Sequence, residues 1–374
     1  MKQMIYLDNA ATTRHKPYSV YTAYLRYSLF NGGNAGRGLN ALSLKGVDTL
    51  IQAQERVAEL LGVKKPENIV FVPNATYGLN MAIMGVLDEK DNVVTTEMDH
   101  NSVLRPCALH GNFSVAHADK NGFVSPISLR RQIKSSTRLV VSTHVSNVCG
   151  TVEPVDEFVR TAHHKGALFL LDASQSAGSV KINMEELGAD ILVCPGHKGL
   201  MGPMGTGILC IKDPEKVKAT IVGGTGSNSE SLIQPETMPD KFHSGTMNLP
   251  AIAGLIRGVE FVLNEGTDAI GEKKHMLNSM LRHELMNMPN VTIYGEGATG
   301  ITAFNIGDVP SDEVASQLGE DIIVRAGYHC APLAHKALGT QDRGAVRISF
   351  GYFNTVRDVK TAVDRIYKVL RNYW

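Results

Sequence analysis

The sequence has no net charge and no long apolar run. Lys+Arg and Asp+Glu both number 37, so the formal net charge at pH 7 is zero. A dedicated nucleic-acid binder or a protein that docks on acidic membranes needs a basic face, so neither class is expected. No apolar stretch approaches the length that crosses a bilayer, and the N-terminus lacks the apolar core of a signal peptide. We therefore expect a soluble, cytoplasmic protein.

Cysteine is also scarce. The five cysteines are an odd number, and none of them forms a Cys-x-x-Cys pair. Neither a disulfide framework nor a zinc ribbon is expected, and no metal site is predicted. The chain does have length and apolar residues: 374 residues, of which 43% are hydrophobic. That is enough for a large core, in two domains or in one large α/β domain with an appendage.

Apolar runs alternate with helical patterns from residue 69 onward. Strands are predicted near residues 69–72, 92–96, 138–142, 167–171, 191–194 and 207–211, with helices between them. This alternation indicates a mainly parallel sheet covered on both faces. We predict a large domain over residues 15–250 and a smaller α+β domain over residues 251–374, with an N-terminal arm, residues 1–14, packing on the smaller domain.

One lysine stands among glycines directly after a predicted strand. The segment 195–203 (PGHKGLMGP) places Lys198 where the backbone turns tightly. An amine in that position is well placed to form a Schiff base with an aldehyde cofactor. The apolar run 167–171 ends in Asp172, and the 26 residues from Asp172 to Lys198 suffice for one crossover between parallel strands. A carboxylate for a pyridinium nitrogen and an amine for an aldehyde are what pyridoxal 5'-phosphate (PLP) requires.

Other polar residues follow predicted strands in the same region. Ala75 and Thr76 stand at a helix start, which is either a phosphate site or an ordinary helix cap. His100 could stack on an aromatic cofactor and move protons, although with 13 histidines in the chain a surface position is the default. Asn147 and Gln175 could hydrogen-bond a cofactor or stabilise loops.

Cys330 and Arg347 are the candidates for contact with a substrate. Cys330 follows His329 and is preceded by Arg325, and nearby positive charge increases the thiolate fraction of a cysteine. The competing interpretation is a packing thiol, as for the other four cysteines. Arg347 lies in a strand-like pattern, and we expect its guanidinium to pair with a carboxylate. That carboxylate is either the α-carboxylate of an amino acid or an acidic residue of the chain itself.

Taken together, these segments resemble a known family. The chain is similar over nearly its whole length to the class V aminotransferase-like PLP enzymes and, within them, to cysteine desulfurases and selenocysteine lyases. The resemblance is carried by residues 6–13 (YLDNAATT), 143–147 (THVSN), 172–175 (DASQ), 196–198 (GHK), 244–246 (SGT) and 325–331 (RAGYHCA). The surroundings of Cys330 resemble the short cysteine loop of group II desulfurases. Two residues depart from that group: Pro195 stands where many members have serine, and Tyr328 stands at a position that is often histidine.

The resemblance implies an α/β architecture, the PLP-dependent transferase fold type I, and a role for each candidate. Lys198 would hold PLP and shuttle a proton, and Asp172 would keep the pyridine nitrogen protonated. His100 would stack on the ring, and Gln175 would bond its phenolic oxygen. The phosphate would be held by Ala75, Thr76 and His197, with Thr246 reaching in from the partner subunit of a homodimer.

The resemblance also implies the reaction. Asn147, which also contacts the cofactor, and Arg347 would bind the substrate carboxylate, with Arg325 as a further substrate-binding residue. The Cys330 thiolate would take sulfur from L-cysteine as a persulfide, release L-alanine and pass the sulfur to an acceptor protein. Selenocysteine lyases share much of the scaffold, so L-selenocysteine is a candidate second substrate.

Two other functions remain open. The alternative within PLP chemistry is an aminotransferase, epimerase or β-lyase acting on another amino acid, with Cys330 incidental. The alternative outside catalysis is a scaffold protein with the same fold.

Overall fold

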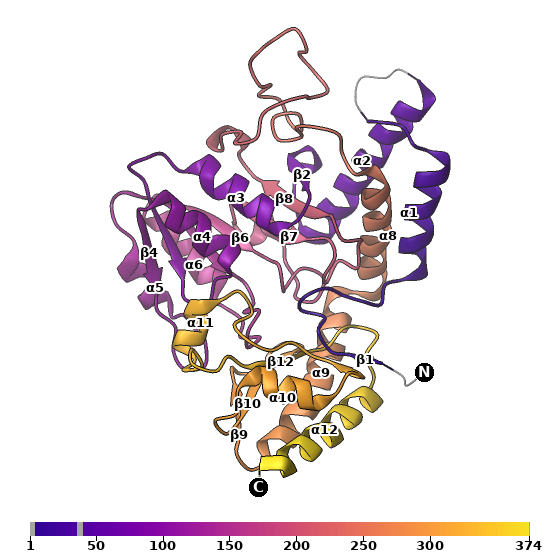
Figure 1. Ribbon diagram of the computed structural model, residues 1–374. Helices are drawn as coiled ribbons and strands as arrows, with labels where there is room; N and C mark the ends of the chain where they lie inside the picture. The colour runs from indigo at the N-terminus through magenta and orange to yellow at the C-terminus, as the bar shows by residue number, and fades with distance from the viewer. Residues whose placement is uncertain (1–3, 36–39, 374) are drawn as a thin grey trace.

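The largest unit of the fold is a seven-stranded sheet with the strand order β2-β8-β7-β6-β5-β3-β4 (Figure 1). The computed structural model describes residues 4–35 and 40–373. The strands of this sheet are β2 (Ile69–Val72), β3 (Asn92–Thr96), β4 (Phe113–Ala116), β5 (Thr137–Thr143), β6 (Leu168–Asp172), β7 (Ile191–Pro195) and β8 (Gly207–Ile211). All of the strands predicted from the apolar runs are present in this sheet.

The sheet is mostly parallel, as predicted. The strands β4, β3, β5, β6 and β7 run parallel to one another, whereas β8 runs antiparallel to its two neighbours, β7 and β2. The carboxyl ends of β5, β6 and β7 therefore lie at one edge of the sheet. Ligands of such sheets bind beyond the carboxyl ends of the strands, so this edge is where a site is expected.

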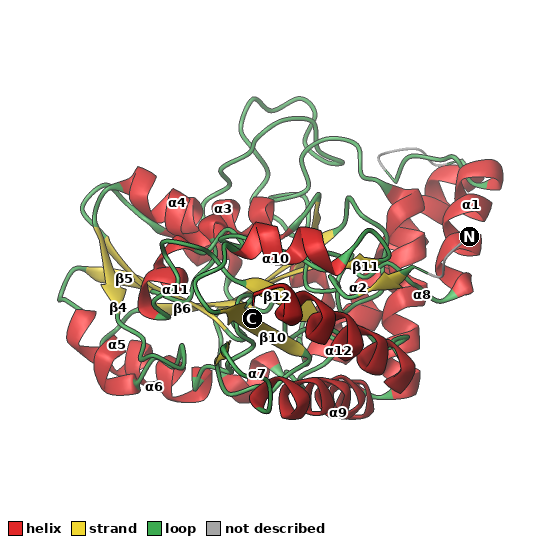
Figure 2. Ribbon diagram, turned by 60° about the horizontal axis from the view of Figure 1, so that its bottom comes forward, coloured by secondary structure: helices red, strands yellow, loops and turns green. Residues whose placement is uncertain are grey.

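Helices cover both faces of the sheet (Figure 2). One face is covered by α3 (Ala75–Val86) and α4 (Asn101–His110). The other carries α2 (Ala41–Leu61), α5 (Pro126–Gln132), α6 (Val155–His164), the short α7 (Met184–Leu187) and α8 (Leu249–Glu265), with α1 (Tyr18–Phe30) packed on α8. Within β2, Ile69 and Phe71 join the core on one face and Val70 and Val72 the core on the other. Because successive side chains point to opposite faces, a strand buried on both faces is a continuous apolar run.

The C-terminal part of the chain forms a second, antiparallel sheet with the order β12-β10-β9. Its strands are β9 (Val291–Tyr294), β10 (Ile301–Ile306) and β12 (Val346–Ser349), and its helices are α9 (Thr267–Met286), α10 (Ser311–Leu318), α11 (Pro332–Ala337) and α12 (Val356–Leu370). Short 3-10 helices lie at Pro66–Asn68, Pro214–Lys216 and Arg371–Tyr373. This part has its own apolar core, built from α9, α10, α12 and the three strands.

The N-terminal arm lies beside this smaller sheet. Its strand β1 (Ile5–Tyr6) pairs in parallel with β11 (Ile322–Ile323), and Asp8 bridges to Ser349. The first three residues of the predicted arm and Trp374 lie outside the described residues. The division at residues 15–250 and 251–374 stays a prediction. In the parts of the chain that the structure covers, no helix is both long and apolar enough to cross a bilayer.

Candidate active site

Lys198 lies three residues beyond the end of β7 in a tight turn. The turn is closed by backbone hydrogen bonds from Met201 N to Lys198 O (3.0 Å) and from Gly202 N to Gly196 O (2.7 Å). Gly199 has to be glycine, because a Cβ there would overlap the carbonyl oxygen of Ala177. Burial lowers the pKa of Lys198 to about 8, while the nearby Asp172 carboxylate opposes this shift. The amine is therefore closer to its neutral, nucleophilic form than an exposed lysine is.

Asp172 is the last residue of β6, next to β7 in the sheet. Its side chain is buried, with 2% of the residue exposed, and its Oδ1 accepts a hydrogen bond from Ser174 N at 2.9 Å. Asp172 lines the same cavity as Lys198 and His100, and its negative charge opposes the lowering of the pKa of both groups. The sheet register thus places a buried carboxylate and a lysine amine together, as predicted from their positions after neighbouring strands.

His100 caps the N-terminus of α4. Its Nδ1 accepts a hydrogen bond from Ser102 N at 3.0 Å, so a neutral ring carries its proton on Nε2. Burial lowers the pKa of His100. The negative charge of Asp172 raises this pKa, and the positive charge of Lys198 lowers it further. His100 is therefore a neutral imidazole at pH 7, held in one tautomer by the backbone of its own helix.

The start of α3 faces the same region. Asn74 caps the helix by accepting a hydrogen bond from Tyr77 N (3.0 Å), and Ala75 and Thr76 are its first two residues. Thr76 Oγ1 and Ser102 Oγ are 2.7 Å apart, so the first turns of α3 and α4 are hydrogen-bonded through their hydroxyls. The first N–H groups of a helix have no partner within the helix, and together with the helix dipole they attract an anion.

These groups line one cavity. It contains eight of the residues predicted to bind the cofactor: Ala75, Thr76, His100, Asn147, Asp172, Gln175, His197 and Lys198. Burial lowers the pKa of His197 to about 4, which makes its ring a neutral hydrogen-bonding group. Ser102 also lines the cavity and was missed by the sequence analysis. A hydroxyl two residues after His100, at the start of a helix, is the signal that could have identified it.

Thr246 does not lie in this cavity. It is exposed and lines a separate pocket together with Phe242, His243 and Tyr77. Thr246 belongs to the segment 217–248, which has no helix or strand and projects from the body in Figure 1. A single chain therefore does not bring Thr246 to Lys198.

Arg347 lies in β12 and is almost fully buried, with 2% of the residue exposed. Its Nη2 forms an ion pair with Asp8 Oδ1 at 2.7 Å, and its Nη1 donates to Asn147 O at 2.8 Å. Arg325 Nε lies 3.4 Å from the other oxygen of Asp8. The carboxylate that the sequence analysis expected for Arg347 is thus provided here by the chain itself. Asp8 had not been singled out, because 339 residues separate it from Arg347.

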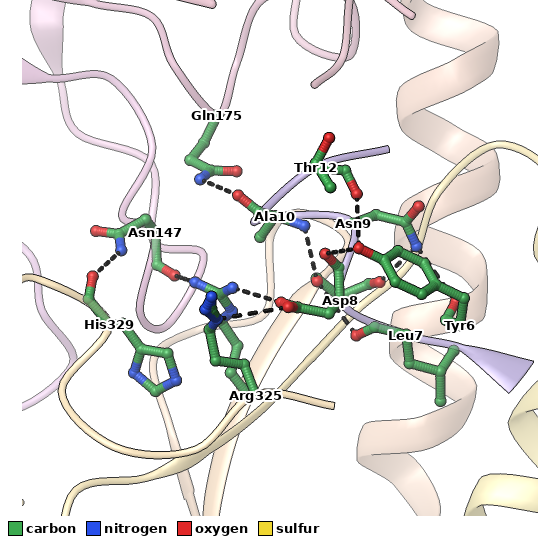
Figure 3. Close-up of polar contacts among 12 residues, drawn as sticks. Tyr6, Leu7, Asp8, Asn9, Ala10, Thr12, Asn147, Gln175, Arg325 and His329 are labelled. Carbon is green, nitrogen blue, oxygen red and sulfur yellow. Dashed lines mark hydrogen bonds and ion pairs between the residues drawn. The ribbon is translucent and has the colours of Figure 1, made fainter. Parts of the chain in front are cut away.

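The two predicted amide ligands are hydrogen-bonded to the protein (Figure 3). Asn147 Nδ2 donates to His329 O at 2.7 Å, and Gln175 Nε2 donates to Ala10 O at 3.0 Å. Each amide therefore connects the cavity to another segment, Asn147 to the segment that carries Cys330 and Gln175 to the N-terminal arm. Their side-chain oxygens are the groups left to accept bonds from a ligand.

Cys330 is exposed, whereas the other four cysteines are buried. His329 and Cys330 both have left-handed backbone conformations, with φ of 50° and 57°. Two consecutive non-glycine residues in that region are strained. The strain is opposed by hydrogen bonds from Asn147 to His329 O and from Asn101 N to Cys330 O, both at 2.7 Å. Because Asn101 follows His100 and Asn147 lines the cavity, Cys330 is anchored to the cavity wall.

Known proteins resemble this chain over nearly its whole length. Residues 5–361 match the family model described as "Aminotransferase class-V". The chain is 34% identical to a probable cysteine desulfurase of Methanothermobacter thermautotrophicus, covering 96% of this chain and 93% of the relative, and 32% identical to one of Halalkalibacterium halodurans, covering 95% and 90%.

A solved structure is also similar. The apo structure of a cysteine desulfurase from Thermococcus onnurineus superposes with a TM-score of 0.93 at 30% identity, covering 99% of this chain and 95% of that one. The chain belongs to the class-V aminotransferase family, among relatives that are named cysteine desulfurases.

Proposed function

We propose that this protein is a PLP-dependent cysteine desulfurase that converts L-cysteine to L-alanine and keeps the sulfur as a persulfide on Cys330. The observation that carries the proposal is the connection between Cys330 and the cavity. Asn147, which lines the cavity, and Asn101, which follows the cavity residue His100, hold the backbone of His329 and of the exposed Cys330. A PLP enzyme that only moves amino groups has no need of such a thiol.

The residues present match the groups of PLP. Lys198 supplies the amine for its aldehyde, and Asp172 supplies a buried carboxylate for the pyridine nitrogen. His100 supplies a flat neutral ring, and Gln175 keeps an oxygen free for a hydrogen bond. The N-terminus of α3, with Ala75, Thr76 and His197, supplies donors for a phosphate. Bound there, PLP would withdraw electrons from the Cα of an amino acid.

The chain itself supplies the remaining steps. Arg347 and Asn147 would bind the substrate carboxylate, with Arg325 nearby at the exposed side. Lys198 Nζ would take the proton from Cα, which suits an amine whose pKa burial has lowered to about 8. Cys330 Sγ would attack the substrate sulfur, so that an S–S bond forms while the C–S bond of the substrate breaks.

The experiment that tests the reaction uses Cys330→Ala. This variant should keep the yellow absorbance of the holoenzyme and lose persulfide formation from L-cysteine, measured by mass spectrometry. Cys107→Ala is the matched control, since Cys107 is buried in α4 and burial raises the pKa of its thiol to about 12. If Cys330→Ala released sulfur at the full rate, Cys330 would not be the acceptor.

We also propose a homodimer with shared sites. Large apolar side chains are exposed on the outer face of α1 and in the projecting segment: Tyr18, Leu29, Phe30, Leu232 and Ile233. A second copy covering them would remove this surface from water. It would also give the exposed Thr246 a phosphate to contact in the partner. A monomer by analytical ultracentrifugation at micromolar concentration would contradict this proposal.

The remaining assignments concern partners and location. We propose L-selenocysteine as a second substrate, because selenium leaves carbon more easily than sulfur does, and a protein as the sulfur acceptor, because Cys330 is exposed. Side-by-side turnover of the two amino acids, with and without a reducing thiol, tests the first. We propose a cytoplasmic location, which the five unpaired cysteines support.

A further inference from the structure

The N-terminal arm places one carboxylate on both arginines that are proposed to bind the substrate. Asp8 Oδ1 lies 2.7 Å from Arg347 Nη2, and Asp8 Oδ2 lies 3.4 Å from Arg325 Nε. The two arginines face each other across an antiparallel bridge, with backbone hydrogen bonds in both directions. Their side chains therefore converge on Asp8 from neighbouring backbone positions.

The net charge of Arg325, Arg347 and Asp8 can be neutralised by one further carboxylate. The guanidinium groups of Arg325 and Arg347 together carry two positive charges, and Asp8 carries one negative charge. One further carboxylate would balance the group, whereas two would leave it with excess negative charge. In a partly buried setting an unbalanced charge is costly, because water screens it poorly.

Arg347 also keeps a donor for that carboxylate. Its Nη2 is bonded to Asp8 and its Nη1 to Asn147 O, while its buried Nε has no hydrogen-bond partner. A buried N–H without a partner is unfavourable, and an incoming carboxylate oxygen would satisfy it. Asp8 thus accepts a hydrogen bond from Nη2 of the Arg347 guanidinium and leaves Nε available for a ligand carboxylate.

The arm does not depend on the charge of Asp8 for its position. Ala10 O accepts from Gln175, Thr13 Oγ1 donates to Lys198 O at 2.9 Å, and Asn9 Nδ2 donates to Ser349 O at 3.0 Å. These bonds lie on the C-terminal side of Asp8, and the β1–β11 pair lies on its N-terminal side. Exchanging the carboxylate for an amide of the same shape should leave the arm in place.

We propose that Asp8 determines substrate specificity by setting the charge of the carboxylate site, so that the site accepts amino acids with one carboxylate and disfavours dicarboxylic amino acids. Asp8 acts through Arg347 and Arg325 and is a positioning residue. The inference rests on the proposed function, in which Arg347 binds the carboxylate of the amino-acid substrate.

The experiment compares two ligands of the holoenzyme, L-alanine with one carboxylate and L-aspartate with two. Their dissociation constants are measured from the change in cofactor absorbance. In Asp8→Asn, affinity for L-aspartate relative to L-alanine should rise roughly tenfold, because one negative charge has been removed near both ligands. Arg325→Gln, which removes a positive charge, should shift the same ratio in the opposite direction.

Asn9→Ala is the matched control, because it removes an anchor of the arm without a change of charge. It should change both affinities in parallel and leave their ratio as in the wild type. If Asp8→Asn weakened both ligands equally, Asp8 would be an anchor of the arm and the proposal would be wrong. If Asp8→Asn failed to fold, an unchanged ratio in Arg325→Gln would overturn the proposal equally well. Alanine release from L-cysteine, measured separately, reports on the proposed function.

Discussion

Asn147 gives the sharpest prediction about how the protein positions its thiol. The side-chain amide of Asn147 donates a hydrogen bond to His329 O, whereas the family resemblance implies that Asn147 contacts the cofactor and the substrate carboxylate. In Asn147→Ala the bond to His329 is lost, whereas Lys198 and Asp172 are untouched. We expect the variant to keep the absorbance of the bound cofactor and to form persulfide slowly.

The size of the effect follows from the strain in the cysteine segment. Holding His329 and Cys330 in left-handed conformations costs about 1–2 kcal/mol for each residue. A hydrogen bond contributes about 0.5–1.5 kcal/mol, and a carbonyl that loses its partner in a buried setting costs about 1–3 kcal/mol. Asn147→Ala therefore removes a stabilising free energy comparable to the free-energy cost of the strained conformation of His329 and Cys330. A loss of about 1–3 kcal/mol corresponds to about 5- to 150-fold slower persulfide formation.

The assay is single-turnover formation of the persulfide, followed by mass spectrometry at saturating L-cysteine. The matched control is Asn278→Ala, because the buried Asn278 amide also donates to a backbone carbonyl, Thr299 O, at 2.7 Å, but outside the cavity. This control separates a local effect from general loss of stability. If Asn147→Ala formed persulfide at the normal rate under saturation and only its KM rose, Asn147 would act on the substrate alone and the reasoning would be refuted.

Three further predictions concern stability and pH. Arg347→Leu should lower the free energy of unfolding by about 3–5 kcal/mol in urea titrations, because it removes the buried partner of Asp8 and leaves only the more exposed Arg325 beside this carboxylate; Asp8→Asn in addition should restore much of this stability, and no restoration would contradict the pairing. In the cofactor-free protein, the pKa of Lys198 is lowered from its ordinary value of 10.5 to about 8, so between these two pH values the unfolded chain keeps a proton on this amine that the folded chain has lost. The free energy of unfolding should therefore rise with pH across that window, and Lys198→Met should flatten the rise. Equal slopes in both proteins would count against the burial of this amine. Gly199→Ala should reduce both cofactor binding and stability, because its Cβ overlaps Ala177 O, while Gly224→Ala, which meets open space, should change neither; equal tolerance of both would disprove the tight turn.

The sheet could be predicted from sequence because its strands are buried on both faces. Runs such as Ile69–Val72 and residues 168–171 are apolar for that reason, and the positions just beyond them identified the cavity. The direction of β8 could not be predicted from its composition. An apolar strand such as Gly207–Ile211 is buried on both faces whether it runs parallel or antiparallel to its neighbours.

The contacts that complete the site are long-range, and for that reason the sequence analysis missed them. Asp8 meets Arg347 across 339 residues, and Thr13 meets the carbonyl of Lys198 across 185. No periodicity or local composition reports such a pair, although Arg347 in a strand did indicate that a carboxylate would be near. The left-handed conformations of His329 and Cys330 were equally hidden, because glycine and asparagine are the residues that normally signal them.

The central claim is that Cys330 accepts the sulfur of L-cysteine while held beside the Lys198 cavity. The most direct test is intact-protein and peptide mass spectrometry of the holoenzyme after one turnover with L-cysteine, together with a measurement of the alanine released. The account predicts one added sulfur on the peptide that contains Cys330 and an equal amount of alanine. Alanine release without added sulfur on Cys330, or formation of a keto acid in place of alanine, would contradict it.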